Sequence, residues 1–246
     1  MALPTLGHEH LAMNSPKPNN NDPAAWLTPG RVTLLVAALF VAGFPGVVAG
    51  TATFFRLDYG VIGYPALQHF VAAVKSTKIP LWNAYSNCGT PFLAQWGTMC
   101  LYPGNLLLLA FPMPWSLGVF CLGHLCLGAW GMQRLARKWT DDPLAAAFAA
   151  FAFAFNGAVL SSLIWPNYCV ALGWMPWLVL TMQQAWRDGG RWLPIAALIG
   201  AFQMLVGVPE LVLLTWAFIV AWWWIDRRNA GTRISGLPHR RWSCCS

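Results

Sequence analysis

Charged residues are scarce in this chain. Only 9% of its 246 residues are charged, eight of them acidic, whereas 57% are hydrophobic. Soluble domains carry about 25% charged residues, so the composition excludes an ordinary soluble domain and predicts an integral membrane protein. The net charge of +7 is spread over short loops and the two ends of the chain. That distribution is typical of membrane topology rather than of nucleic-acid binding.

The signatures of common soluble enzymes are also missing. The sequence contains no phosphate-binding glycine loop, dinucleotide fingerprint, zinc-type histidine pair or nucleophile elbow. Its seven cysteines form no metal-binding pattern, and those within apolar runs are expected to behave as small hydrophobic residues. Cys88 and Cys100 share one long loop. A disulfide between them would need suitable geometry and an oxidising compartment.

The hydrophobic residues gather in long runs, and a membrane span needs about 20 of them. We therefore predict an all-α, polytopic transmembrane bundle. Residues 1–30 are predicted to form a disordered cytoplasmic leader, residues 31–228 the transmembrane domain, and residues 229–246 a cytoplasmic tail. The six predicted spans are Val32–Phe55, Trp115–Met132, Pro143–Ile164, Cys169–Trp186, Trp192–Val208 and Leu211–Ile225.

The basic residues predict the orientation of these spans. With both termini in the cytoplasm, twelve of the fifteen Lys and Arg residues lie inside, as the positive-inside rule requires. Only Arg56, Lys75 and Lys78 then lie outside, in the loop 56–103 between the first two spans. The same topology leaves Asp58 and Glu210 as the only acidic residues on the outer face.

The outer loop itself is predicted to be ordered. Within Tyr64–Lys78 the apolar residues recur at helical spacing, which predicts an amphipathic helix lying in the membrane interface. Residues 79–103 combine Pro and Gly with large apolar side chains, which is typical of a packed loop without regular structure. Asn105–Phe111 is too short to cross a membrane, and we interpret it as a re-entrant or interfacial piece.

Asp58 is the leading candidate for catalysis. It is the only acidic residue between Asp22 and Asp141, and it follows the first span directly. Its carboxylate is suited to act as a general base toward a hydroxyl group, or as an oxygen ligand for a divalent cation. The structural alternatives are a solvated acid at headgroup level and an ion-pair partner of Arg56.

Other polar residues of the predicted outer face are candidates for substrate binding. Each has a structural alternative: Glu210 as a helix-start carboxylate, loop asparagines as turn formers, and cations as contacts to anionic lipid. The candidates are Arg56, His69, Asn83, Asn87, Gln95, Asn156, Asn167 and Glu210.

Several short motifs, in this order and spacing, resemble YfhO-like bacterial membrane proteins, which are related to the C-type glycosyltransferases. The resemblance covers about residues 31–226. Beginning at Asp58, the motifs are Ile79-Pro80-Leu81-Trp82-Asn83, the run from Asn87 to Trp96, Leu101-Tyr102-Pro103, Ala154-Phe155-Asn156-Gly157, Trp165-Pro166-Asn167, Gly173-Trp174-Met175-Pro176-Trp177 and Gly207-Val208-Pro209-Glu210.

The resemblance implies a multi-pass enzyme of the bacterial cytoplasmic membrane. Such an enzyme transfers a sugar from a polyprenyl-phosphate carrier to an envelope acceptor on the outer face. It implies that Asp58 assists the acceptor hydroxyl, directly or through a divalent cation, and that Arg56 contacts the donor phosphate. The chain departs from the family in having no Asp-x-Asp pair and in ending after six spans. The resemblance therefore implies an N-terminal portion, such as a truncation or frameshift would produce.

Two other functions stay open from the sequence. A transporter or flippase for a lipid-linked or small polar substrate would use ionisable groups near the bilayer midplane and related halves. The predicted mid-span positions offer His124 and Gln203, and no internal repeat is visible. His124 is expected to be packed and hydrogen-bonded to a neighbouring helix. The third interpretation is a non-catalytic membrane scaffold or an inactive fragment.

Overall fold

The computed structural model describes residues 26–95 and 97–232, and this part of the chain is mostly helical. The helices are α1 (Pro29–Gly43), α2 (Pro45–Val48), α3 (Tyr64–Lys75), α4 (Leu106–Ala110), α5 (Trp115–Ala136), α6 (Pro143–Ala154), α7 (Gly157–Ser161), α8 (Pro166–Asp188), α9 (Trp192–Met204) and α10 (Pro209–Thr232). Two short antiparallel strands, β1 (Trp82–Asn83) and β2 (Thr90–Pro91), form a hairpin in the long loop.

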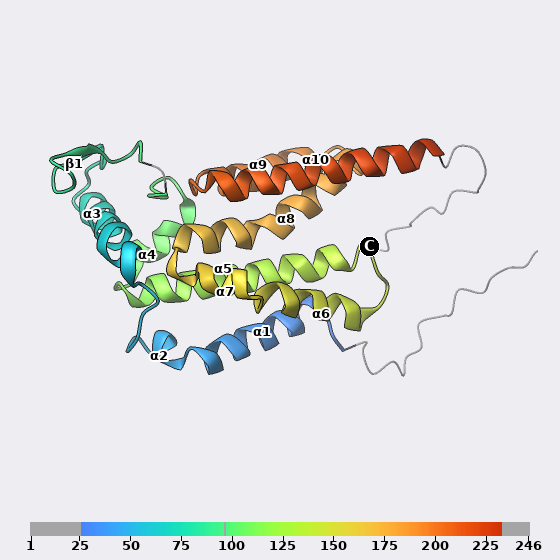
Figure 1. Cartoon of the computed structure of the whole chain (residues 1–246), viewed down its shortest axis with the longest axis horizontal. Helices are drawn as coiled ribbons and strands as arrows, with labels where there is room; N and C mark the ends of the chain where they lie inside the picture. Colours follow the sequence, from blue (N-terminus) through green and yellow to red (C-terminus); the bar gives the residue numbers. More distant parts are fainter. Residues whose placement is uncertain (1–25, 96, 233–246) are drawn as a thin grey trace, which may run out of the picture.

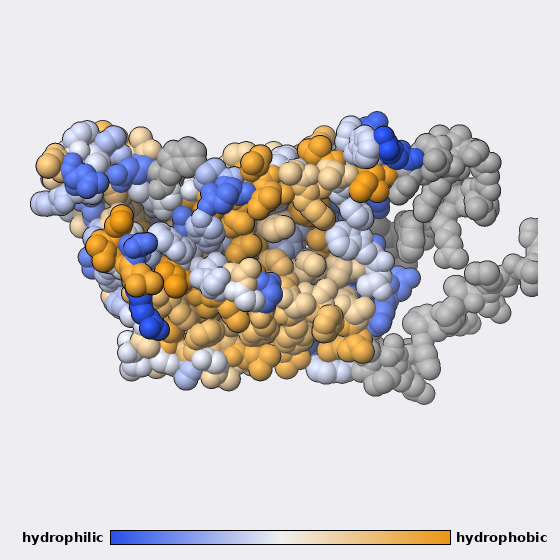
Figure 2. Space-filling model, viewed as in Figure 1, coloured by the Kyte–Doolittle hydropathy of each residue, from blue (hydrophilic) through white to orange (hydrophobic). Residues whose placement is uncertain are grey.

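The helical prediction is confirmed, and part of the described chain has the dimensions of membrane spans. By length and composition, three helical segments within the described residues can cross a membrane: Trp115–Ala136, Pro143–Ile164 and Pro209–Arg228. The apolar helices α1 and α9 are shorter. Figure 2 shows an apolar middle flanked by more polar residues at the left and right, as expected for a protein that sits in lipid.

The chain runs back and forth between two ends (Figure 1). α1 and α2 lead from right to left, α5 returns, α6 and α7 lead back, and α8, α9 and α10 continue the alternation. The long loop with α3 and β1 therefore lies at the left, which we call the loop end. The right is the basic end. It holds Arg31, Arg134, Arg137, Lys138, Arg187, Arg191, Arg227 and Arg228.

Hydrogen bonds join the helix termini at the basic end. Gln133 Nε2 and Arg137 Nη2, near the end of α5, donate to the carbonyl oxygen of Leu27 at 3.2 and 3.1 Å. Arg187 of α8 forms an ion pair with Asp226 of α10, with a 2.7 Å N–O separation. The first and last helices are thereby tied to the two central ones.

The two central helices, α5 and α8, approach each other through glycine. A Cβ placed on Gly173 would lie 2.6 Å from the carbonyl oxygen of His124, and one on Gly128 would lie 3.3 Å from Gly173 Cα. The backbones therefore touch at this crossing, as is common where small residues line helix contacts in membranes. α1, α2 and α6 pack on α5, while α9 and α10 pack on α8. The α5–α8 pair is the spine of the bundle.

Two predicted spans are interrupted. Helix α1 ends at Gly43, because Phe44 leaves the helical region before Pro45, which has no N–H to donate and starts α2. The run Val32–Phe55 is thus not one continuous helix. Pro143–Ile164 is broken at Asn156, whose side chain accepts from Val159 N and donates to Phe153 O. Those side-chain bonds replace main-chain bonds at the break.

The long loop contains more regular structure than predicted. Helix α3 buries Leu67 and Phe70 and ends three residues before the predicted Lys78, because Thr77 adopts a φ of +57°. The hairpin occupies part of residues 79–103, and α4 occupies most of Asn105–Phe111. Cys88 and Cys100 are free thiols, so the disulfide considered for them is not formed.

The ends of the predicted transmembrane domain fall close to the limits of the described residues. Most of the predicted leader 1–30 lies outside these residues, but Leu27 is buried and α1 already begins at Pro29. At the other end α10 continues to Thr232, past the predicted boundary at 228. The rest of the predicted tail lies outside the described residues.

The glycine contact between α5 and α8 generates a stability prediction. We expect Gly173→Ala to lower the free energy of unfolding by about 1–3 kcal/mol, because the added methyl group meets the backbone of α5. Thermal unfolding of the purified protein in detergent measures this. The matched control is Gly123→Ala, which adds a methyl group where no atom lies within 4 Å and favours the helix. Equal thermal unfolding midpoints for the two variants would contradict this role of the glycine contact.

Candidate functional site

Asp58 is exposed at the loop end, beside a residue that is firmly held. It precedes a short π-helical turn, Tyr59–Gly63, and Tyr59 itself is buried. The Tyr59 ring packs against Trp165 with a centroid distance of 5.5 Å. Burial raises the pKa of Tyr59 far above its usual value, so its hydroxyl stays neutral. The Tyr59 anchor fixes the backbone while the Asp58 side chain reaches solvent.

The Asp58 carboxylate forms no ion pair with a described residue, although Arg56 is exposed two residues before it. Residues 26–95 and 97–232 contain no group of three or more His, Cys, Asp or Glu that could hold a metal ion. Divalent cations take several oxygen ligands, and the described side chains do not gather such a set at Asp58.

Glu210, the second carboxylate of this end, has a specific partner. It lies in the first turn of α10 and accepts a hydrogen bond from the hydroxyl of Tyr168, in the first turn of α8. The Tyr168 ring lies 6.5 Å from that of Trp165. A row of aromatic rings, Tyr59, Trp165 and Tyr168, therefore leads from the Asp58 segment to Glu210.

Asn167 adjoins the long loop at Gly97. A Cβ on Gly97 would lie 3.1 Å from Asn167 Nδ2, and the φ of +76° at Gly97 also favours glycine. The Oδ1 atom of Asn167 is buried and has no hydrogen-bond partner among the described residues. A buried acceptor without a donor is costly.

A groove of about 700 Å³ lies between the loop and the start of α10. We call it the loop groove. Gln95 and Thr98 supply polar groups on the loop side, and Val208, Pro209 and Val212 form an apolar wall on the helix side. Gln95 is the predicted binding residue that lines it. Glu210 follows Pro209 directly, and Asn167 adjoins the groove residue Gly97.

The remaining predicted binding residues have local roles. Asn83 is buried, and its Oδ1 accepts from Tyr85 N at 3.0 Å. Asn87 occupies a turn with a φ of +47°, and Asn156 caps α7. The side chains of Asn83 and Asn156 thus bond to nearby backbone, and Asn87 is a residue type that tolerates the left-handed conformation. His69 packs its ring 5.0 Å from that of Phe92, and its buried Nε2 has no partner among the described residues.

A chain of hydrogen bonds holds the loop to the bundle. Trp174 Nε1 donates to Tyr102 Oη at 2.8 Å, and Tyr102 Oη lies 2.7 Å from His124 Nε2. His124 Nδ1 lies 2.8 Å from the Phe120 carbonyl oxygen, so Nδ1 carries the proton and Nε2 accepts from Tyr102. Burial raises the pKa of Tyr102 and keeps it a donor. We call this chain the Tyr102 clasp.

Sequence reasoning only partly predicted these contacts. His124 is packed and hydrogen-bonded as expected, but its side-chain partner is Tyr102 of the loop rather than a neighbouring helix. Tyr168, Tyr102 and Trp174 were not singled out individually. The available signal was the place of Tyr102 and Trp174 in the Leu-Tyr-Pro and Gly-Trp-Met-Pro-Trp motifs, and of Tyr168 directly after Trp-Pro-Asn.

The Tyr102 clasp generates the second prediction. Tyr102→Phe removes one hydroxyl and leaves both Trp174 Nε1 and His124 Nε2 without their partner. We expect the free energy of unfolding to fall by about 1–3 kcal/mol and residues 97–105 to exchange backbone amide hydrogens faster. Tyr85→Phe is the matched control, since Tyr85 is 92% exposed. Similar amide exchange in both variants would show that the clasp does not hold the loop.

The chain matches no protein-family model, no curated protein and no solved structure. The contacts at the loop end are therefore the basis for assigning a function.

Proposed function

We propose that this chain is a membrane glycosyltransferase-like protein. It would transfer a sugar from a polyprenyl-phosphate carrier to an envelope acceptor at the loop end. The observation that carries the proposal is Asp58, an exposed carboxylate whose backbone is anchored by the buried Tyr59. The loop groove and Glu210 at the same end add a place for a second substrate. Catalytic carboxylates need this combination of access and fixed position.

The proposed reaction uses Asp58 as a general base. Its carboxylate accepts the proton of the acceptor hydroxyl while that oxygen bonds to the anomeric carbon of the sugar. The bond from that carbon to the phosphate oxygen breaks, and the polyprenyl phosphate leaves with the electron pair. Arg56, two residues before Asp58 and exposed, offers positive charge to the leaving phosphate.

The proposal includes an orientation in the bacterial cytoplasmic membrane. Six spans would place both termini in the cytoplasm and the loop end outside. It is supported by the described basic residues, because eight lie at the basic end and three at the loop end.

Substitution of Asp58 tests the proposed reaction. Membranes containing the protein encoded by the complete reading frame are supplied with a radiolabelled polyprenyl-phosphate sugar, and transfer to endogenous acceptor is measured. We expect Asp58→Asn to lower the transfer rate by about 100-fold or more, the contribution typical of a general base, without changing the amount of protein in the membrane.

Asp141→Asn is the matched control for this assay. It makes the same change at an exposed acidic residue of the basic end, so its transfer rate should equal that of the unaltered protein. A normal rate in Asp58→Asn membranes would overturn the proposed role of Asp58.

A further inference from the structure

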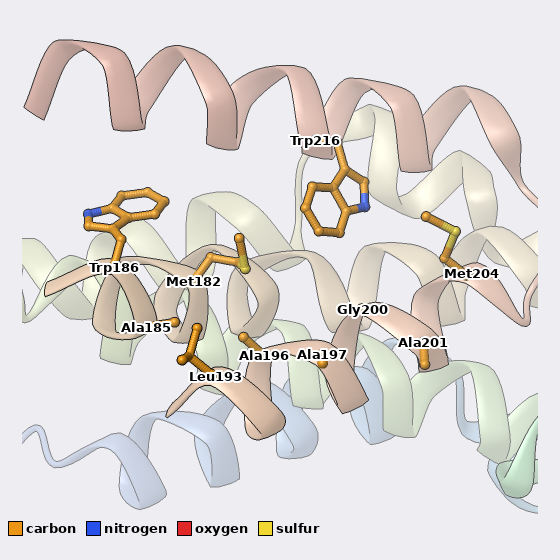
Figure 3. A pocket seen from close by; sticks show the side chains of 10 residues that line it. All are labelled: Met182, Ala185, Trp186, Leu193, Ala196, Ala197, Gly200, Ala201, Met204 and Trp216. Carbon is orange, nitrogen blue, oxygen red and sulfur yellow. The ribbon is translucent and has the colours of Figure 1, made fainter. Parts of the chain in front are cut away.

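A second cavity, open on one side, lies between α8, α9 and α10 (Figure 3). We call it the α9 crevice, and its volume is about 470 Å³. The side chains drawn in Figure 3 extend from all three helices, with Trp186 and Trp216 beside the space under α10. The wall formed by α9 is made of small residues, namely Ala196, Ala197, Gly200 and Ala201. The crevice therefore has an apolar, smooth interior.

The crevice has the length of a lipid chain in one leaflet. Its lining residues on α9 run from Leu193 to Met204, which corresponds to about 16 Å at 1.5 Å per residue. This is about half of the 30 Å hydrocarbon thickness of a bilayer. Only 11% of the apolar stretch of α10 is buried inside the protein, so the crevice lies beside a helix that faces lipid. A hydrocarbon chain can enter it from the membrane.

The α9 crevice and the loop groove share two lining residues. Met204 and Trp216 line both cavities, and Figure 3 shows the Trp216 ring extending from α10 toward α9, near Met204. The two cavities are therefore neighbours that meet at these two side chains. The α9 crevice is apolar, and the loop groove offers Gln95 and Thr98. Together they are complementary to a molecule with a polar head and one hydrocarbon chain.

The groove part also restricts the chemistry of the head. None of the described residues that line either cavity is charged. Glu210, next to the groove residue Pro209, would repel an anion, and a buried phosphate without a cation is strongly disfavoured. Hydroxyl groups, in contrast, can bond to Gln95 and Thr98, which line the groove.

We infer that the two neighbouring cavities together bind one uncharged, hydroxyl-bearing amphiphile, which passes between Met204 and Trp216 with its single hydrocarbon chain in the α9 crevice and its head in the loop groove. The role of this molecule rests on the proposed function, in which it is the acceptor whose hydroxyl receives the sugar. The phosphate-linked donor then binds elsewhere at the loop end. Binding of the amphiphile does not itself depend on transfer.

Photolabelling tests the inference directly. The protein in phosphatidylcholine nanodiscs is irradiated with an alkyl glucoside that carries a diazirine at the end of its chain, and labelled residues are identified by mass spectrometry. We expect label on residues that line the crevice, in 182–186, 193–204 and 216. Dodecyl glucoside should compete for this labelling, and dodecyl phosphate should compete about tenfold less well, a difference of about 1.4 kcal/mol.

Filling the crevice provides the matched comparison. Ala201→Leu should lower crevice labelling by about fivefold or more, which corresponds to about 1 kcal/mol. Ala197→Leu is the second variant, used if the first alters the elution of the protein on size exclusion. Ala217→Leu makes the same change on α10 at an exposed position that lines neither cavity, and should label normally. Unchanged labelling in both filled variants, or equal competition by dodecyl phosphate, would overturn the inference.

The two proposals can fail separately. Crevice labelling that depends on Ala201, together with normal transfer by Asp58→Asn, supports the amphiphile site and contradicts the catalytic role. Loss of transfer in Asp58→Asn, with labelling unaffected by the filled crevice, supports the catalytic role and contradicts the site.

Discussion

The close approach of α5 and α8 at Gly128 and Gly173 is the constraint on which the rest of this structure depends. In lipid there is no hydrophobic force between helices, so association relies on close packing and hydrogen bonds. The glycines allow backbone contact at the crossing, and 56% of the apolar stretch of α5 is buried. α1 and α6 then pack on one side of this pair and α9 and α10 on the other.

The loop end is positioned by the same crossing. The His124 carbonyl is the group that Gly173 leaves room for, while the His124 ring accepts from Tyr102. Trp174, which follows Gly173, donates to the same tyrosine hydroxyl. On α5, His124 therefore takes part in both the backbone contact and the Tyr102 clasp. On α8, the two interactions use the adjacent residues Gly173 and Trp174. Any change in the spacing of α5 and α8 would move Tyr102, and with it the residues of the long loop that line the groove.

The sequence predicts the helices well and their interruptions poorly. Long apolar runs identify α5, α8 and α10 because helix content follows from composition and length. The breaks at Pro45 and Asn156 depend on single residues whose effect is decided by local capping. Within the candidate site, Glu210 could be proposed from its isolation as an acid, but its partner Tyr168 is 42 residues away. The two cavities arise from packing between α8, α9, α10 and the loop, which no local pattern encodes.

Charge divides the loop end into two chemically different parts. Arg56 and Asp58 are exposed and two residues apart. One segment therefore offers both a cation for a phosphate and a carboxylate that can accept a proton. The described residues of the loop groove carry no charge, and a polar molecule there meets amide and hydroxyl groups instead. In the proposed transfer, the two parts bind substrates of different charge. The anionic donor is favoured beside Arg56, and an uncharged acceptor is favoured in the groove. An enzyme with this arrangement would not bind two donors at once, because an anion in the groove would lack a cation and lie beside Glu210.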